Sequence, residues 1–170
     1  MKNNIILIGF MGVGKGTTAR AFSKKYGAFI LDTDDLIESK ENAEVKKVFA
    51  KKGEAYFRQQ EQATADWIES SVQGTFISCG GGFYKVDNLK KLGTVVLLDA
   101  SFEWIHTRLK TAKNSKSKLA KRPLFAQEAE AKKLYKERES MYKKLADVVV
   151  DVEHLSMDEQ LAFIAKKCKW

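Results

Sequence analysis

A short glycine-rich stretch constrains the fold of this chain more than any other feature. The segment Gly9–Thr18, GFMGVGKGTT, places four glycines in ten residues. It follows the apolar run Ile5–Ile8 and leads into a helical pattern over Lys15–Tyr26. Glycine reaches backbone torsions that other residues avoid, and it lets amide groups approach an anion closely. A strand, a glycine loop and a helix in this order predict a loop that binds phosphate at the start of the helix.

The spacing within this loop indicates a nucleotide. Gly9, Gly14 and Lys15 follow the pattern Gly, four residues, Gly-Lys, in which the lysine reaches the β- and γ-phosphates. The next position usually carries a Ser or Thr hydroxyl that binds Mg²⁺. Here that position is Gly16, and Thr17 comes one place later. A turn that only caps the helix is the alternative, and the order of strand, loop, lysine and helix disfavours it.

The rest of the chain alternates apolar runs with longer helical patterns. This alternation predicts an α/β fold, a central five-stranded parallel sheet between layers of helices. A length of 170 residues fits one domain, 1–170. The predicted strands are Ile5–Ile8, Phe29–Leu31, Thr75–Ser78, Val95–Leu98 and Val148–Val150. The predicted helices are Lys15–Tyr26, Asp35–Ser39, Glu44–Ala50, Glu54–Ser71, Ser101–Leu109, Gln127–Ala146 and Met157–Lys167.

Composition narrows the possible partners and the compartment. The net charge of +8 suits nucleic acid or an anionic small molecule, and it also suits an ordinary surface rich in lysine. No apolar run reaches the length of a membrane span, and the first strand follows Met1 too closely for a signal peptide. Cys79 and Cys168 have neither metal-ligand spacing nor a disulfide framework, which favours a cytoplasmic protein.

Polar residues and glycines follow two of the predicted strands. Asp32, Asp34 and Asp35 come after the second strand, where ligands bind in open α/β sheets. Such carboxylates hold Mg²⁺ or accept a hydroxyl proton. Alternatively, Asp34 or Asp35 caps the helix that follows, which would explain one of the three aspartates without a ligand. The glycine triplet 80–82 follows the third strand and permits either close backbone approach to a ligand or a flexible turn.

Two arginines occupy notable helical positions. Arg58 shares a helix face with Glu54 and Glu61, and an exposed ion-pair ladder is the simplest interpretation. Arg138 falls inside an apolar stripe of the last long helix. An arginine on a buried face needs an anionic partner. That partner is either a core carboxylate or the carboxylate of a substrate, and the pattern does not choose between them.

A basic, polar segment over 110–121 interrupts the helical patterns and ends at Arg122-Pro123. Such a segment inside a compact domain is either a solvated loop or a lid. A lid can deliver an arginine that stabilises charge on a transferring phosphoryl group, and Arg122 is the candidate.

Taken together, these segments resemble shikimate kinase, a family in the nucleoside-monophosphate-kinase branch of P-loop enzymes. The resemblance runs in order through LIGFMGVGKGTT, LDTDDLIE, GEAYFRQQE, ISCGGG, KRPLF and LYKERESMYKKLAD. It implies a P-loop NTPase fold, with a helical substrate-binding region at about 33–61 and a lid at about 110–125. It also implies phosphorylation of the 3-hydroxyl of shikimate by ATP with Mg²⁺, in the pathway to chorismate and the aromatic amino acids. The expected state is a cytoplasmic monomer that binds neither nucleic acid nor membrane.

The resemblance also implies residue roles. The catalytic residues are Lys15, Asp34 as base and Arg122. ATP is bound by Gly12, Val13, Gly14, Lys15, Gly16, Thr17, Arg108 and Arg122, with Arg108 against the adenine. Shikimate is bound by Asp34, Arg58, Gly80, Gly81 and Arg138, and Glu61 orients Arg58. Mg²⁺ is held by Asp32 and by Ser78 through water, with Thr17 a weaker candidate.

Two other functions compete with this one. The first is a gluconate or nucleoside-monophosphate kinase, because the glycine loop of adenylate kinases also has the sequence Gly-Lys-Gly-Thr. The two arginines, Asp34 and the glycine triplet favour shikimate. A nucleotide-gated nucleic-acid-binding module is the second, motivated by the +8 charge. It would need basic residues interleaved with exposed aromatic residues, whereas the lysines are spread over several helices.

Overall fold

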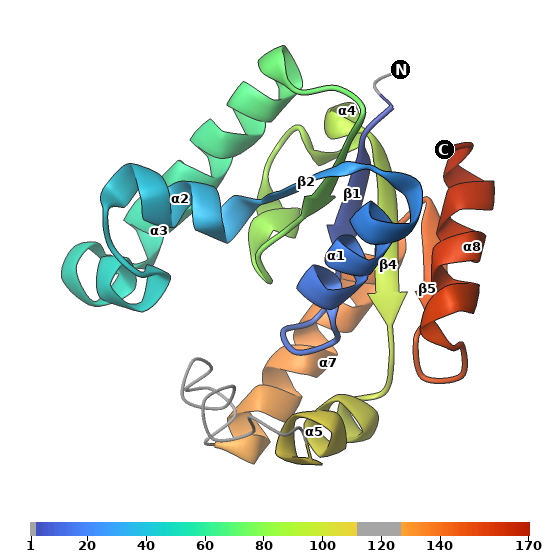
Figure 1. Ribbon diagram of the computed structural model, residues 1–170. Coiled ribbons are helices and arrows are strands. Elements are labelled where there is room, and N and C mark those ends of the chain that lie inside the picture. Colours follow the sequence, from blue (N-terminus) through green and yellow to red (C-terminus); the bar gives the residue numbers. More distant parts are fainter. Residues whose placement is uncertain (1–2, 112–126) are drawn as a thin grey trace.

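Five parallel strands form a single sheet in a computed structural model that describes residues 3–111 and 127–170 (Figure 1). The strand order is β2-β3-β1-β4-β5. The strands are β1 (Ile5–Ile8), β2 (Phe29–Asp32), β3 (Thr75–Ser78), β4 (Thr94–Asp99) and β5 (Val148–Asp151). The predicted five-stranded parallel sheet is confirmed, and β4 is one residue longer at each end than its pattern indicated.

Helices cover both faces of the sheet. They are α1 (Lys15–Tyr26), α2 (Thr33–Glu41), α3 (Val45–Ser71), α4 (Leu89–Leu92), α5 (Phe102–Thr111), α7 (Glu128–Leu145) and α8 (Met157–Cys168). Helices α1 and α8 contact each other on one face, and α4 and α7 contact β4 from the other (Figure 1). The α/β/α layering is therefore confirmed. No helix of the described residues is both long and apolar enough to cross a membrane.

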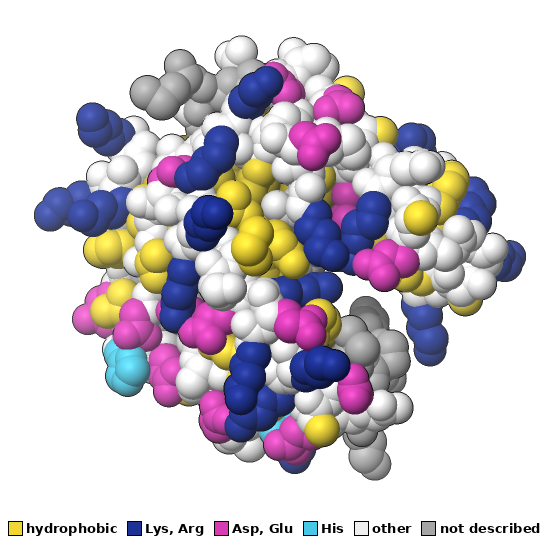
Figure 2. Space-filling view, turned by 180° about the vertical axis from the view of Figure 1, so that it is seen from behind, with side chains coloured by type: hydrophobic (Ala, Val, Ile, Leu, Met, Phe, Trp, Pro, Cys, Tyr) yellow, Lys and Arg dark blue, Asp and Glu magenta, His cyan; other side chains and the backbone are white. Residues whose placement is uncertain are grey.

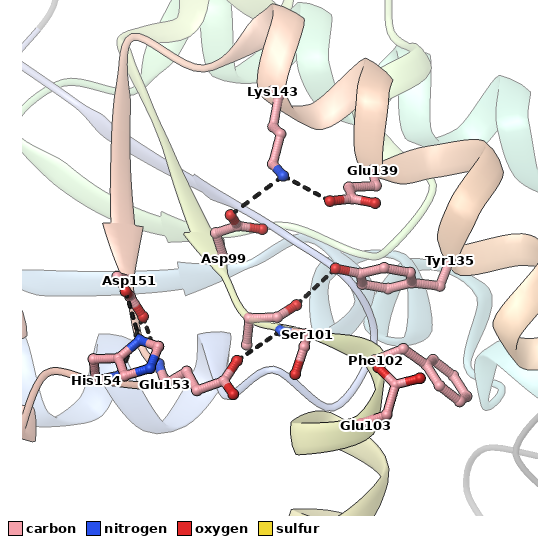
Figure 3. A pocket seen from close by; sticks show the side chains of 11 residues that line it. Asp99, Ser101, Phe102, Glu103, Tyr135, Glu139, Lys143, Asp151, Glu153 and His154 are labelled. Carbon is pink, nitrogen blue, oxygen red and sulfur yellow. Dashed lines mark hydrogen bonds and ion pairs between the residues drawn. The ribbon is translucent and has the colours of Figure 1, made fainter.

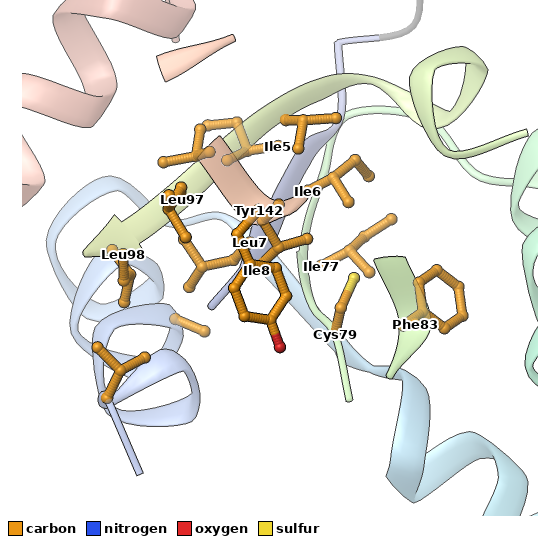
Figure 4. Packing of buried hydrophobic residues seen from close by; sticks show 14 of the residues in the cluster. Ile5, Ile6, Leu7, Ile8, Ile77, Cys79, Phe83, Leu97, Leu98 and Tyr142 are labelled. Carbon is orange, nitrogen blue, oxygen red and sulfur yellow. The ribbon is translucent and has the colours of Figure 1, made fainter. Parts of the chain in front are cut away.

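The main core surrounds the central strands. All four residues of β1 are at most 1% exposed, because helices bury both faces of this strand. Figure 4 shows β1 residues packed with Ile77, Leu97 and Tyr142. A central strand this well packed fixes where the loop after β1 begins. The carboxyl ends of β1, β2 and β3 then lie side by side at one edge of the sheet.

A second, small core joins α2 to the first part of α3. It contains Ile37, Val48 and Phe57, and Figure 1 shows this pair of helices projecting from the sheet. Gly53 interrupts α3 with φ 81° and ψ 171°, so two helical segments meet there at a kink. The two helices predicted over this region are those segments. A positive φ of this size favours glycine, which explains why glycine occupies the kink.

Two details differ from the sequence prediction, and one part of it is not tested. Helix α2 begins at Thr33 because Asp32 caps it, with Oδ1 accepting from the amides of Asp34 (2.9 Å) and Asp35 (3.4 Å). The prediction of a cap by Asp34 or Asp35 is therefore wrong. The 3₁₀ turn η1 (Phe83–Lys85) and α4 were missed, since such short elements carry no helical period. Most of the predicted lid, and Arg122, fall outside the described residues.

Candidate active site

The glycine loop presents its backbone at the start of α1. Gly12 and Gly14 have φ values of 86° and 114°, which allow the sharp path between β1 and α1. Gly14 is the N-cap of α1 and, as a glycine, has no side chain that could bond the first amides of the helix. The Lys15 ammonium donates to the carbonyls of Gly9 (2.7 Å) and Phe10 (3.3 Å), which holds it above the loop. A helix start without a side-chain N-cap, next to a fixed ammonium, is a site suited to phosphate.

Helix α5 packs against this loop and brings Arg108 to it. The Nη1 atom of Arg108 donates to the carbonyl of Gly12 (3.1 Å), and the guanidinium lies over the ring of Trp104. A Cβ at Gly14 would lie 2.8 Å from the same nitrogen. The structure thus places Arg108 at the edge of the glycine loop, next to Gly12, Val13 and Gly14.

The candidate metal residues lie on two neighbouring strands. Asp32 ends β2 and Ser78 ends β3, and the two residues are opposite each other in the sheet register. Asp32 uses Oδ1 for its helix cap, and Ser78 is buried. Thr17 is exposed on α1, and Gly16 precedes it in the first turn. Within the described residues, no group of three or more His, Cys, Asp or Glu could hold a metal ion by itself.

Asp34 combines burial with an unsatisfied oxygen. Its Oδ1 is buried and has no hydrogen-bond partner among the described residues. Burial raises the pKa of Asp34 to about 7, and the nearby Asp32 and Glu61 carboxylates raise it further, while Lys15 opposes them. A carboxyl group that titrates near neutral pH is suited to accept a proton from a hydroxyl.

Arg58 is held by two carboxylates from its own helix. Its Nε and Nη2 donate to Oε1 of Glu54 (3.2 and 3.0 Å), and its Nη1 donates to Oε2 of Glu61 (2.5 Å). The Glu61 side chain is only 2% exposed, so this is not the fully exposed ladder that the sequence suggested. Burial raises the pKa of Glu61, and Arg58 opposes that effect. The described residues use three of the five N–H groups of Arg58, and the other two can bind a ligand.

Arg138 is buried without an ion pair to any described residue. It is 9% exposed, and its Nη1 donates to the neutral carbonyl of Gly81 (3.0 Å). The same carbonyl accepts from the hydroxyl of Tyr142 (2.6 Å). Of the two partners that the sequence left open, no core carboxylate of the described residues lies within ion-pair distance of Arg138, although its charge does act on the buried Glu61.

The glycine triplet gives room to the three side chains just described. A Cβ at Gly80 would collide with the Asp34 carboxylate, and one at Gly82 would lie 2.7 Å from Nη2 of Arg58. A Cβ at Gly81 would lie 3.2 Å from Nη1 of Arg138. None of these glycines has a positive φ, so they are needed for space and not for an unusual backbone conformation.

The triplet is also anchored, which argues against a flexible turn. The Gly80 amide donates to Oγ1 of Thr33 (2.9 Å), and the Phe83 amide donates to the Gly80 carbonyl (3.1 Å). The sequence prediction did not include Thr33 or Tyr142. Thr33 lies between Asp32 and Asp34, whose carboxylates carry the more obvious chemistry, and Tyr142 fits the apolar stripe of α7 as an ordinary core residue.

A cavity of about 380 Å³ lies apart from these residues, beyond the carboxyl ends of β4 and β5. Figure 3 shows it between α7, the start of α5 and the segment after β5, with Asp99, Glu139 and Glu153 among its lining side chains. Lys143 pairs there with Asp99 and Glu139. Five of its eleven lining residues are acidic and none of them is a predicted site residue, so it does not belong to the phosphate site.

Comparison with known proteins decides the family. The profile described as "Shikimate kinase" matches residues 11–169. The chain belongs to the shikimate kinase family. A curated shikimate kinase from Helicobacter hepaticus is 38% identical over 148 residues, which cover 87% of this chain and 86% of that protein.

Solved structures of this family share the fold. The crystal structure of shikimate kinase from Aquifex aeolicus is 32% identical, with a TM-score of 0.77, over 98% of this chain and 96% of that one. Shikimate kinase from Acinetobacter baumannii, solved in complex with shikimate, is 29% identical with a TM-score of 0.80, over 96% of this chain and 90% of that one. The P-loop fold and the family resemblance found in the sequence are thereby confirmed.

Proposed function

We propose that this chain transfers the terminal phosphoryl group of ATP to the 3-hydroxyl of shikimate, giving ADP and shikimate 3-phosphate. Family membership supplies the reaction. The observation that carries the substrate assignment is the buried Arg138, which has no ion pair within the described residues and lies beside the glycine triplet together with Arg58 and Asp34. A buried guanidinium with no described carboxylate within ion-pair distance is suited to a ligand that brings one.

The nucleotide phosphates fit the glycine loop. The backbone amides at the start of α1, where the N-cap Gly14 has no side chain, and the ammonium of Lys15 offer the donors that a polyphosphate requires. Phosphoryl transfer asks the protein mainly for positioning and for stabilisation of negative charge. We assign these tasks to the backbone of 12–17 and to Lys15, with Arg108 at the edge of the loop and Arg122 approaching from the lid.

Mg²⁺ fits a site in which the protein supplies few direct ligands. Asp32 and Ser78 lie side by side at the ends of β2 and β3, and Gly16 brings no hydroxyl. Mg²⁺ keeps several waters and commonly binds through one or two carboxylates and substrate phosphates. We therefore propose that Asp32 and Ser78 act through water. Thr17 is exposed and one position further round α1, so we give it a phosphate contact at most.

Shikimate would lie between the two arginines and Asp34. Arg58 and Arg138 would bind its carboxylate, and Glu61 keeps the guanidinium of Arg58 in place. The amide of Gly80 already donates to Thr33, so we assign substrate hydrogen bonds to the amides of Gly81 and Gly82. Gly80 contributes the space that Asp34 occupies.

Asp34 would orient the reacting hydroxyl and accept its proton. Its buried Oδ1 lacks a partner among the described residues, and its pKa of about 7 keeps a useful fraction ionised at neutral pH. A hydroxyl of the substrate would satisfy that oxygen. The expected dependence of activity on pH therefore has an acid limb near pH 7.

The remaining assignments concern the state of the protein. We propose a cytoplasmic monomer, and the two free cysteines suit a reducing compartment. On the face in Figure 2, Lys and Arg side chains are mixed with Asp and Glu side chains. This distribution supports a small anionic substrate over nucleic acid as the partner, and a gel shift at moderate salt tests the point.

A coupled assay of ADP release tests the acceptor. Purified protein with MgATP is given shikimate, gluconate or AMP in separate reactions. We expect release of ADP that depends on shikimate alone. Consumption of gluconate or AMP with no response to shikimate would refute the proposed function.

A further inference from the structure

Tyr142 lies where the core meets the glycine triplet. Its ring is 3% exposed among the aliphatic side chains of the main core (Figure 4). Its hydroxyl donates to the carbonyl of Gly81 (2.6 Å), and its ring meets that of Tyr84 edge-on at 5.0 Å between centroids. The side chain is therefore fixed at both ends, by packing and by a short hydrogen bond.

The carbonyl that Tyr142 contacts is shared with Arg138. Arg138 and Tyr142 lie one turn apart on α7, and both donate to the oxygen of Gly81. Their roles differ once a substrate carboxylate is present, because an arginine can turn its donors toward an anion. The buried tyrosine has no charge to attract an anion. It is the donor that stays on Gly81.

A peptide group between two glycines needs such an anchor. Glycine residues rotate about φ and ψ more freely than other residues, so the 81–82 peptide plane can turn at little cost. The peptide group is planar and trans, hence a fixed Gly81 carbonyl also fixes the direction of the Gly82 N–H. Both glycines must remain glycine, since side chains there would meet Arg138 and Arg58. The rigidity of this segment must come from outside it.

We propose that Tyr142 is a positioning residue that holds the 81–82 peptide plane, so that this plane stays fixed when Arg138 engages the substrate. The inference rests on the proposed function, since it concerns the shikimate site. Tyr142 touches neither reactant and acts through Gly81 and Arg138. Burial raises the pKa of Tyr142 to about 12, so the hydroxyl remains a donor throughout the physiological range.

The test compares two Tyr→Phe substitutions on α7, each of which removes one hydroxyl group. Tyr142→Phe removes the hydroxyl and keeps the ring. Tyr135→Phe is the matched control, because the Tyr135 hydroxyl also donates to a backbone carbonyl, that of Ala100 (2.8 Å), away from the triplet. We expect Tyr142→Phe to raise the KM for shikimate about 3- to 10-fold, the range for one lost hydrogen bond, with the KM for ATP unchanged. Tyr135→Phe should leave the KM for shikimate at the wild-type value.

A second measurement does not depend on catalysis. In ¹⁵N NMR spectra of the substrate-free protein, the amide resonances of Gly81 and Gly82 should broaden by exchange in Tyr142→Phe and stay sharp in Tyr135→Phe. Sharp resonances in both variants, or equal changes of the KM values for shikimate and ATP, would overturn the proposal. A wild-type protein that does not phosphorylate shikimate would refute the proposed function, whereas the NMR comparison would still decide the role of Tyr142.

Discussion

Replacement of Gly82 by alanine tests how the glycine triplet works. The added Cβ would lie 2.7 Å from Nη2 of Arg58 and closer still to Nη1, so the guanidinium must move. The backbone itself allows alanine, because φ at Gly82 is −101°. Arg58 is the far end of a flexible side chain, yet its bond to the buried Glu61 ties it in place. The change therefore displaces a substrate-binding group and leaves the local backbone intact.

The size of the effect follows from the bond that is lost. A hydrogen bond to a charged group contributes about 1.5–3 kcal/mol, which corresponds to an increase of about 10- to 150-fold in the KM for shikimate. The KM for ATP should stay unchanged, because the glycine loop is not involved. Crowding in a packed region costs about 1–3 kcal/mol of unfolding free energy, so the variant should remain folded.

Steady-state kinetics with shikimate varied at saturating ATP provide the assay, with a thermal melt to verify folding. Gly81→Ala is a graded comparison, since its Cβ would lie 3.2 Å from Arg138, and we expect a smaller increase in KM. In an Arg58→Ala background, Gly82→Ala should add little, because both changes remove the same contact. A normal KM for shikimate in Gly82→Ala, or full additivity with Arg58→Ala, would show that the triplet does not act by making room for Arg58.

Three further predictions concern charge. The pKa of Asp34 is about 7 when folded and 3.8 in its ordinary state, so burial of this group lowers stability increasingly as pH rises from 4 to 7. Asp34→Asn should therefore lose activity. Its unfolding free energy should rise by up to about 4 kcal/mol at pH 8 and by nearly nothing at pH 4. Equal gains at both pH values would contradict this prediction. Arg138→Lys should fold normally but bind shikimate at least about tenfold more weakly in calorimetry, since an ammonium cannot form a bidentate fork. Asp32→Asn keeps the cap oxygen and should raise the Mg²⁺ concentration for half-maximal activity far more than Thr17→Val, and the reverse order would make Thr17 the ligand.

The sequence predicted those features that are determined by residues close to one another along the chain. The glycine loop, the strands and the long helices each leave a pattern within a few tens of residues, and all of these elements are confirmed. The two helical patterns predicted over Glu44–Ala50 and Glu54–Ser71 are likewise local, and the structure joins them into α3 with a kink at Gly53. The helix cap at Asp32 was misassigned because three neighbouring aspartates offer the same chemistry, and only the backbone decides which one precedes the helix.

Contacts between distant segments could not be derived in this way. The triplet faces side chains from α2, α3 and α7, so its purpose as space is visible only when the chain is folded. The anionic partner of Arg138 could not be predicted for the same reason. The helical period predicts that this side chain is buried, but it does not show which residue or ligand it faces. Thr33 accepts from the amide of Gly80, and Tyr142 donates to the carbonyl of Gly81. Both side chains are uncharged, so no charge pattern in the sequence indicates these roles.

The position of the phosphoryl group on the product tests the central claim most directly. Purified protein, MgATP and shikimate are incubated to completion, and the product is examined by ³¹P–¹H correlation NMR. We predict a single phosphate ester coupled to the proton on carbon 3, formed in equal amount with ADP and absent when Asp34→Asn replaces the wild-type protein. A phosphate on another hydroxyl, or ADP formed without any shikimate ester, would contradict the placement of shikimate between Asp34, Arg58 and Arg138.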